Sequence, residues 1–192
     1  LALPGSRKGE VSRLMPVIGD TLVRLRAMGL TPRVALPTVR GVEALVRETV
    51  QNWPTSPEII TDPARKRAAF ACADVALAAS GTVSLELAAN GCPMVIAYDM
   101  NPLSFWLMRR AARIDTVTLV NLVTETRVVP EFLGPRCRAD LIAPVLADLM
   151  QDGPARVAQK AAMALTMQRL GAGGEAPGLR AARSVLAALQ PS

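Results

Sequence analysis

Two short turns of the sequence carry the groups best suited to hold a phosphate. They are Gly5-Ser6-Arg7 and Ser80-Gly81-Thr82. In each turn a glycine lets the backbone approach a ligand, a hydroxyl can cap the next helix or donate to an oxygen, and the free amides of that helix favour an anion. Arg7 adds a guanidinium, which suits bidentate phosphate contacts. The residue types therefore predict two phosphate-binding turns, with a solvated basic turn as the alternative for the first.

Glu86 is a candidate ligand for a sugar, because it lies one turn into the helix predicted after the second turn. A capping-box acid follows its Ser or Thr N-cap by three residues, but the residue three before Glu86 is Val83. Glu86 is expected to face the same way as Thr82, where a carboxylate can accept hydrogen bonds from ribose hydroxyls. An ordinary first-turn acid that stabilises the helix dipole is an equally good interpretation.

The segment from Asp74 to Tyr98 predicts the centre of the scaffold that positions these groups. We expect a buried strand at 75–79, a helix at 82–90 and a second buried strand at 94–98. Both strand segments are apolar without alternation, which is typical of parallel strands covered on both faces. The segment is therefore predicted to be a βαβ unit.

The whole chain predicts an α/β fold with a single doubly wound, Rossmann-like parallel sheet of about six strands. The last strand is expected at 116–120, and Pro16 is expected to kink the helix at 10–28 or delay its start. We expect the strand order 3-2-1-4-5-6, which places both glycine turns at one crevice. The sheet domain is predicted to span residues 1–170, with a helical tail at 171–192 after a glycine-rich break.

Composition narrows the classes of function. The chain has 192 residues, a net charge of +6, no histidine and three widely spaced cysteines. The cysteines predict reduced packing residues and no metal site, and the scarcity of aromatic residues argues against nucleic acid. Without histidine, a general base must be a perturbed carboxylate or lysine, or come from outside this chain. Because the chain starts inside a predicted strand, we expect it to be a fragment of a longer protein.

A predicted helix at 103–113 sets apolar and aromatic side chains beside arginines. Its candidate membrane-facing residues are Phe105, Trp106, Arg109, Arg110 and Arg113. This pattern fits a helix on an anionic membrane surface. More often it belongs to a helix that packs on a core and has a charged outer face.

Six motifs run in order from one end of the chain to the other: 3–7 followed by Glu10, 79–82 with Leu85 and Glu86, 92–98, 105–107, 119–122 and 130–133. This ordered set resembles the carboxyl-terminal half of the lipid-A-disaccharide synthase family. Members of that family are glycosyltransferases with two Rossmann-like domains in the GT-B architecture. The resemblance implies that this chain is one half of a GT-B fold and is inactive alone.

The resemblance implies a reaction that joins UDP-2,3-diacylglucosamine to 2,3-diacylglucosamine 1-phosphate, giving lipid A disaccharide 1-phosphate and UDP. The carboxyl-terminal half would hold the UDP-sugar without a metal or other cofactor, and the catalytic residues would belong to the amino-terminal domain. The family also implies a cytoplasmic protein, peripheral to the inner membrane of a Gram-negative bacterium. This location favours the helix at 103–113 as a lipid-facing element, and it leaves a homo-oligomer open.

The resemblance assigns a role to each candidate residue. Ser6 and Arg7 would bind the diphosphate, Ser80, Gly81 and Thr82 would form a cradle of amides and hydroxyls, and Glu86 would bind ribose. Asn121 would contact the donor sugar or the diphosphate, and Glu131 is a further candidate. The sequence departs from the family pattern at Val120, where proline is usual, and at Gly134, where glutamine is usual.

Two alternatives remain at this point. The chain would be part of another GT-B enzyme that uses a UDP-sugar, such as an epimerase or a cell-wall glycosyltransferase. Alternatively, it would be a module that binds a nucleotide or a membrane and has no catalytic activity.

Overall fold

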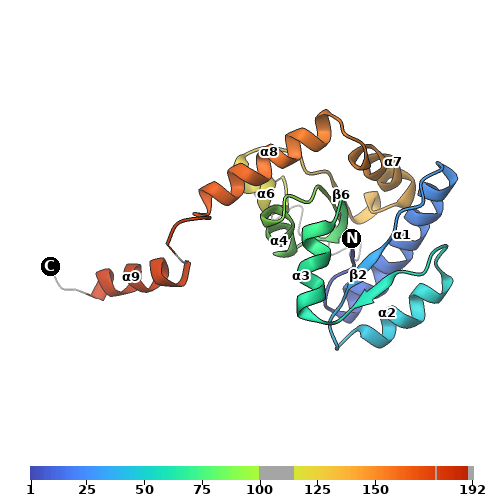
Figure 1. Cartoon of the computed structure of the whole chain (residues 1–192), viewed down its shortest axis with the longest axis horizontal. Helices are drawn as coiled ribbons and strands as arrows, with labels where there is room; N and C mark the ends of the chain where they lie inside the picture. The colour runs from blue at the N-terminus through green and yellow to red at the C-terminus, as the bar shows by residue number, and fades with distance from the viewer. Residues whose placement is uncertain (100–114, 176, 190–192) are drawn as a thin grey trace.

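The fold is built on a four-stranded parallel sheet, seen in a computed structural model that describes residues 1–99, 115–175 and 177–189 (Figure 1). The strand order is β1 (Ala2–Leu3), β4 (Ala76–Ala79), β5 (Met94–Tyr98) and β6 (Glu131–Leu133). A second parallel ladder joins β2 (Ala35–Pro37) to β3 (Glu58–Ile60), and β2 lies beside β1. The predicted α/β class with a Rossmann-like parallel sheet is confirmed.

Helices cover both faces of the sheet. One face carries α1 (Lys8–Ala27), α2 (Glu43–Thr49) and α7 (Ala139–Met150). The other carries α3 (Pro63–Cys72), α4 (Val83–Ala89), α6 (Leu119–Thr124) and α8 (Pro154–Arg169). A short 3-10 turn follows α2 at Val50–Asn52, and another follows β6 at Gly134–Arg136. In Figure 1, α9 (Pro177–Leu189) lies apart from the helices that pack on the sheet.

The apolar strands make this arrangement possible, because successive side chains of a strand point to opposite faces. Leu77 and Val95 belong to the core under α1 and α7. Their neighbours Ala78 and Ile96 belong to the core under α4 and α8. A strand buried on both faces must be apolar at every position, and this requirement explains the lack of alternation in the sequence.

Two details of the strand prediction need correction. The predicted last strand at 116–120 is wrong, because Leu119–Thr124 forms α6 and the sixth strand is Glu131–Leu133. The buried residues Val120, Asn121 and Thr124 recur at helical rather than strand spacing, so a short apolar run was assigned the wrong period. The predicted order 3-2-1-4-5-6 agrees with the observed neighbours of each strand. However, backbone hydrogen bonds do not join β2 to β1 in the described residues, so the strands form one sheet of four and one of two.

The first helix begins earlier than expected. It starts at Lys8 and continues through Pro16, so the delayed start is wrong. Pro16 cannot donate to the carbonyl four residues back, but it and Ser12 are both exposed, so water can reach the free carbonyl. In the described part of the chain, no helix is long and apolar enough to cross a membrane.

Candidate functional site

The two glycine turns lie at the same edge of the sheet. Strands β1 and β4 are parallel and directly paired, with Leu3 opposite Ala78. Each turn follows the carboxyl end of its strand, so the turns are neighbours above adjacent strands. This edge is where open α/β sheets bind ligands, and the predicted adjacency of the two turns is confirmed.

The first turn requires its glycine and is held by Glu10. Gly5 has a φ of 102°, and a Cβ at this position would lie 2.6 Å from Oε2 of Glu10. That oxygen accepts hydrogen bonds from the amides of Ser6 and Arg7, each at 3.4 Å. The other carboxylate oxygen pairs with the Arg7 guanidinium at 3.0 Å. Because the two amide bonds are long, both amides remain able to bind a better-placed acceptor.

The two charged side chains of this turn differ in their exposure to solvent. The Arg7 side chain is 82% exposed, whereas that of Glu10 is only 17% exposed. Sequence reasoning noted Glu10 only as part of a motif. Its position three residues after the N-cap Arg7 is the signal that would have identified it as a capping residue.

The second turn is open and has fewer internal partners. Gly81 has a φ of 151°, and a Cβ there would meet no atom within 4 Å. Its carbonyl accepts a hydrogen bond from the Ser84 hydroxyl at 2.9 Å. Thr82 is the N-cap of α4 but makes no side-chain cap bond, and both Gly81 and Thr82 are exposed. Ser80 is half-buried at the end of β4.

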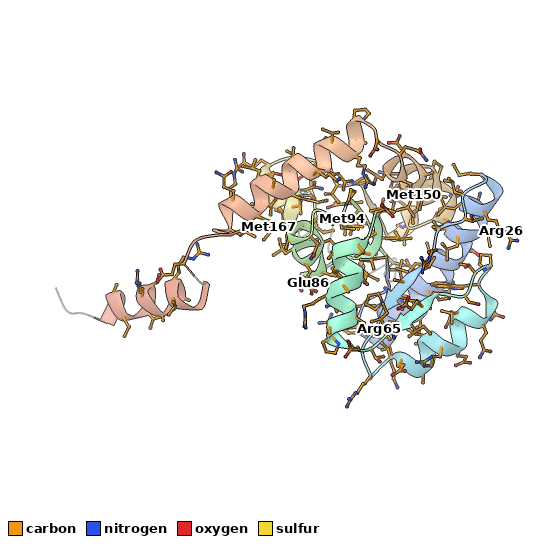
Figure 2. The ribbon with its side chains drawn as sticks, viewed as in Figure 1. Arg26, Arg65, Glu86, Met94, Met150 and Met167 are labelled. Carbon is orange, nitrogen blue, oxygen red and sulfur yellow. The ribbon has the colours of Figure 1, made fainter. Side chains whose placement is uncertain are left out.

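Glu86 contacts the neighbouring helix α3. Its carboxylate lies 2.7 Å from the ammonium of Lys66, and Figure 2 shows the Glu86 side chain next to α3. Both side chains are about half exposed. Nothing in the sequence pattern indicated this pairing. Sequence reasoning therefore missed the partner of a residue that it had selected.

The buried Asn121 and the half-buried Glu131 belong to a cluster with different properties. Asn121 is fully buried, and its amide both donates to the carbonyl of Val129 at 2.9 Å and accepts from the amide of Val129 at 3.0 Å. One oxygen of Glu131 accepts from the amides of Val117 and Thr118, at 3.0 and 2.7 Å. The Thr116 hydroxyl bonds both residues, and it accepts from Asn121 at 3.2 Å. These contacts join the start of α6 to β6.

The remaining predicted features have separate outcomes. Cys92 and Cys137 are buried as expected, and burial raises the pKa of the Cys137 thiol to about 11, but Cys72 is exposed. Over the described residues, no cluster of metal-ligating side chains occurs. The candidate membrane helix at 103–113 lies outside the described residues.

Comparisons with known proteins point to one family. Residues 1–176 match the family model described as lipid-A-disaccharide synthetase. The chain is 57% identical to the lipid-A-disaccharide synthase of Ruegeria pomeroyi, over 97% of this chain and 48% of the relative. It is 43% identical to the Bradyrhizobium diazoefficiens protein of the same name, over 99% of this chain and 48% of the relative. The chain thus spans about half the length of the curated relatives it matches.

Proposed function

The chain belongs to the lipid-A-disaccharide synthetase family, and from this premise we propose that it is the donor-binding half of a glycosyltransferase of lipid A biosynthesis. The complete enzyme would transfer 2,3-diacylglucosamine from UDP to 2,3-diacylglucosamine 1-phosphate, releasing UDP and forming the disaccharide that anchors lipopolysaccharide. This half would hold the UDP-sugar, and the amino-terminal half would supply the acceptor site and the general base.

One observation carries the proposal. The direct pairing of β1 with β4 brings the exposed guanidinium of Arg7 and the open Ser80-Gly81-Thr82 turn to the same sheet edge. A diphosphate needs cationic and amide donors from more than one side, and this edge offers both. Ser6 would add its amide and hydroxyl to the same group.

The chemistry follows from the charge that develops during transfer. As the bond between the sugar's anomeric carbon and the diphosphate oxygen breaks, negative charge accumulates on the leaving UDP. Arg7 and the turn amides would stabilise that charge more strongly in the transition state than in the ground state. No metal or other cofactor is assigned a role.

The other candidate residues would act around this centre. Glu86 would accept hydrogen bonds from the ribose hydroxyls. Asn121 and Glu131 would serve the donor site through the backbone that they hold, because the Asn121 amide and one carboxylate oxygen of Glu131 are engaged inside the protein. The domain that binds the donor would be residues 1–170, with 171–192 as a helical tail.

The setting of the reaction is also part of the proposal. Acylated substrates require access to lipid, so the enzyme would work at the cytoplasmic face of the inner membrane as a peripheral protein. The arginine-rich segment 103–113 and the net charge of +6 favour attraction to an anionic surface. The amino-terminal domain would be its principal partner, and a second copy of the chain remains an option.

The experiment is a binding and turnover comparison. Calorimetry of the whole chain with UDP should show weak binding, and incubation with both lipid substrates should yield no product. Co-expression with the amino-terminal half of the Ruegeria pomeroyi relative should restore disaccharide formation. A folded chain that binds no UDP would contradict the proposal. Epimerised UDP-sugar as the product would identify a different GT-B enzyme.

A further inference from the structure

One ion pair fixes a charge beside the candidate nucleotide site. The ammonium of Lys66 on α3 lies 2.7 Å from Oε2 of Glu86 on α4. The same ammonium lies 5.1 Å from the centroid of the Phe70 ring, one turn further along α3. Phe70 is only 2% exposed, so its ring cannot move freely. The ammonium is therefore held between a carboxylate and an aromatic face.

The pair lies in a hollow of about 440 Å³ between α3 and α4. Asn90, which also lines the hollow, donates from its side-chain amide to the backbone carbonyl of Glu86 at 2.8 Å. This bond secures the backbone of Glu86, and Lys66 secures its carboxylate. Both ends of the Glu86 side chain are thus restrained before any ligand arrives.

The pair is too exposed to matter much for folding. Lys66 is 41% exposed and Glu86 50% exposed, and exposed ion pairs of this kind contribute little to stability. Their effect on binding is different, because an unrestrained glutamate loses rotamer freedom when a ligand fixes it. Pairing at Oε2 removes part of that cost in advance. It also leaves lone pairs on the carboxylate free to accept hydrogen bonds.

We propose that Lys66 is a positioning residue for Glu86 and that the pair gives the nucleotide site its preference for ribose over 2′-deoxyribose. The inference rests on the proposed function, in which Glu86 accepts hydrogen bonds from ribose. Lys66 acts through the carboxylate and does not touch the nucleotide. Removing the ammonium therefore weakens the binding of ligands that carry a 2′-hydroxyl more than the binding of 2′-deoxy ligands, which keep only the 3′-hydroxyl.

The test compares two neutral substitutions on α3. Lys66→Met removes the ammonium and keeps a long side chain, and Arg67→Met removes the same charge one residue away on the same hollow. In Lys66→Met, calorimetry of the whole chain should show an affinity loss for UDP that exceeds the loss for 2′-deoxy-UDP by about twofold to fivefold, the range that an exposed ion pair can supply. Arg67→Met should not change the ratio of the two affinities.

Two further variants complete the test. Lys66→Arg keeps the charge and should retain the ribose preference, whereas Glu86→Gln keeps only a neutral acceptor and should weaken the preference. An equal loss for both nucleotides in Lys66→Met, or no loss at all, would overturn the positioning role while Glu86 keeps its ribose contact. An unchanged ribose preference in Glu86→Gln would instead remove Glu86 from the proposed site, and the inference would fail with it.

Discussion

The polar groups of the two glycine turns are exposed and weakly bonded, whereas those of the cluster around Asn121 are hydrogen-bonded inside the protein. Arg7, Gly81 and Thr82 are exposed, and the amides of the first turn have only long bonds to Glu10. Asn121 is fully buried, with short bonds in both directions to Val129. Open groups are available to a ligand, whereas satisfied groups can only position the chain. Among the candidate site residues, those of the glycine turns are therefore suited to contact a ligand, and those of the Asn121 cluster are suited to hold the backbone in place.

Loss of the buried amide should have the largest effect of any change considered. Asn121→Ala leaves the amide and carbonyl of Val129 without partners, which should lower the free energy of unfolding by about 3 kcal/mol. Urea denaturation measures this change. Asn90→Ala is the matched control, because Asn90 is exposed and its loss should cost less than about 1 kcal/mol. Similar values for the two variants would contradict the contrast between open and closed regions.

Loss of the open guanidinium should change binding and not stability. Arg7→Ala should weaken UDP by on the order of tenfold or more, because a charged hydrogen bond contributes about 1.5–3 kcal/mol. Its stability should stay near that of the wild type, since the pair with Glu10 is exposed on the Arg7 side. Arg13→Ala, an exposed change further along α1, is the control and should bind UDP normally. Equal UDP affinity in Arg7→Ala and wild type would remove Arg7 from the site.

Replacement of two glycines near the first turn by alanine should change the stability of the protein in opposite directions. Gly5→Ala forces a left-handed φ and a contact with Glu10, and should destabilise the protein by about 1–2 kcal/mol. Gly9→Ala adds a methyl group inside α1 with no atom within 4 Å, and should stabilise it by about 0.5–1 kcal/mol. Thermal unfolding of the two variants would reveal any departure from this order.

The smallest expected effect concerns the carboxylate that covers the first turn. Glu10→Gln keeps an oxygen to accept from the turn amides but removes a negative charge beside the proposed diphosphate. UDP affinity should rise because the repulsion between this carboxylate and the diphosphate is lost. The rise should be only about twofold, because solvent already screens that repulsion. Calorimetry at low salt gives the clearest signal. Weaker binding would mean that the charge of Glu10 orients Arg7 rather than opposing the ligand.

Local pattern was enough to predict the centre of the fold. The predicted strand at 94–98 coincides with β5, and helix α4 lies within the predicted 82–90. These elements are buried on both faces or bounded by glycine, so composition and chain position determine them. The adjacency of the two turns also followed, because strand order in such sheets obeys a small set of connection rules.

Features that depend on distant partners escaped prediction. The segment at 116–120 is apolar enough for a strand, but Asn121 must reach Val129 and Glu131, and helix α6 allows these bonds. The pairing of Lys66 with Glu86 joins α3 and α4, which precede and follow β4 in the sequence and cover the same face of the sheet, and no spacing along the chain indicates it. Tertiary contacts decide such choices, and short elements are the most sensitive to them.

A crystal structure of the whole chain with UDP tests the central claim most directly. The account predicts that the diphosphate lies between the two turns, within hydrogen-bond distance of Arg7 and of the Ser80-Gly81-Thr82 turn, while Asn121 keeps both bonds to Val129. A diphosphate bound at another edge of the sheet, or an Asn121 side chain that has left Val129 to bind UDP, would contradict it.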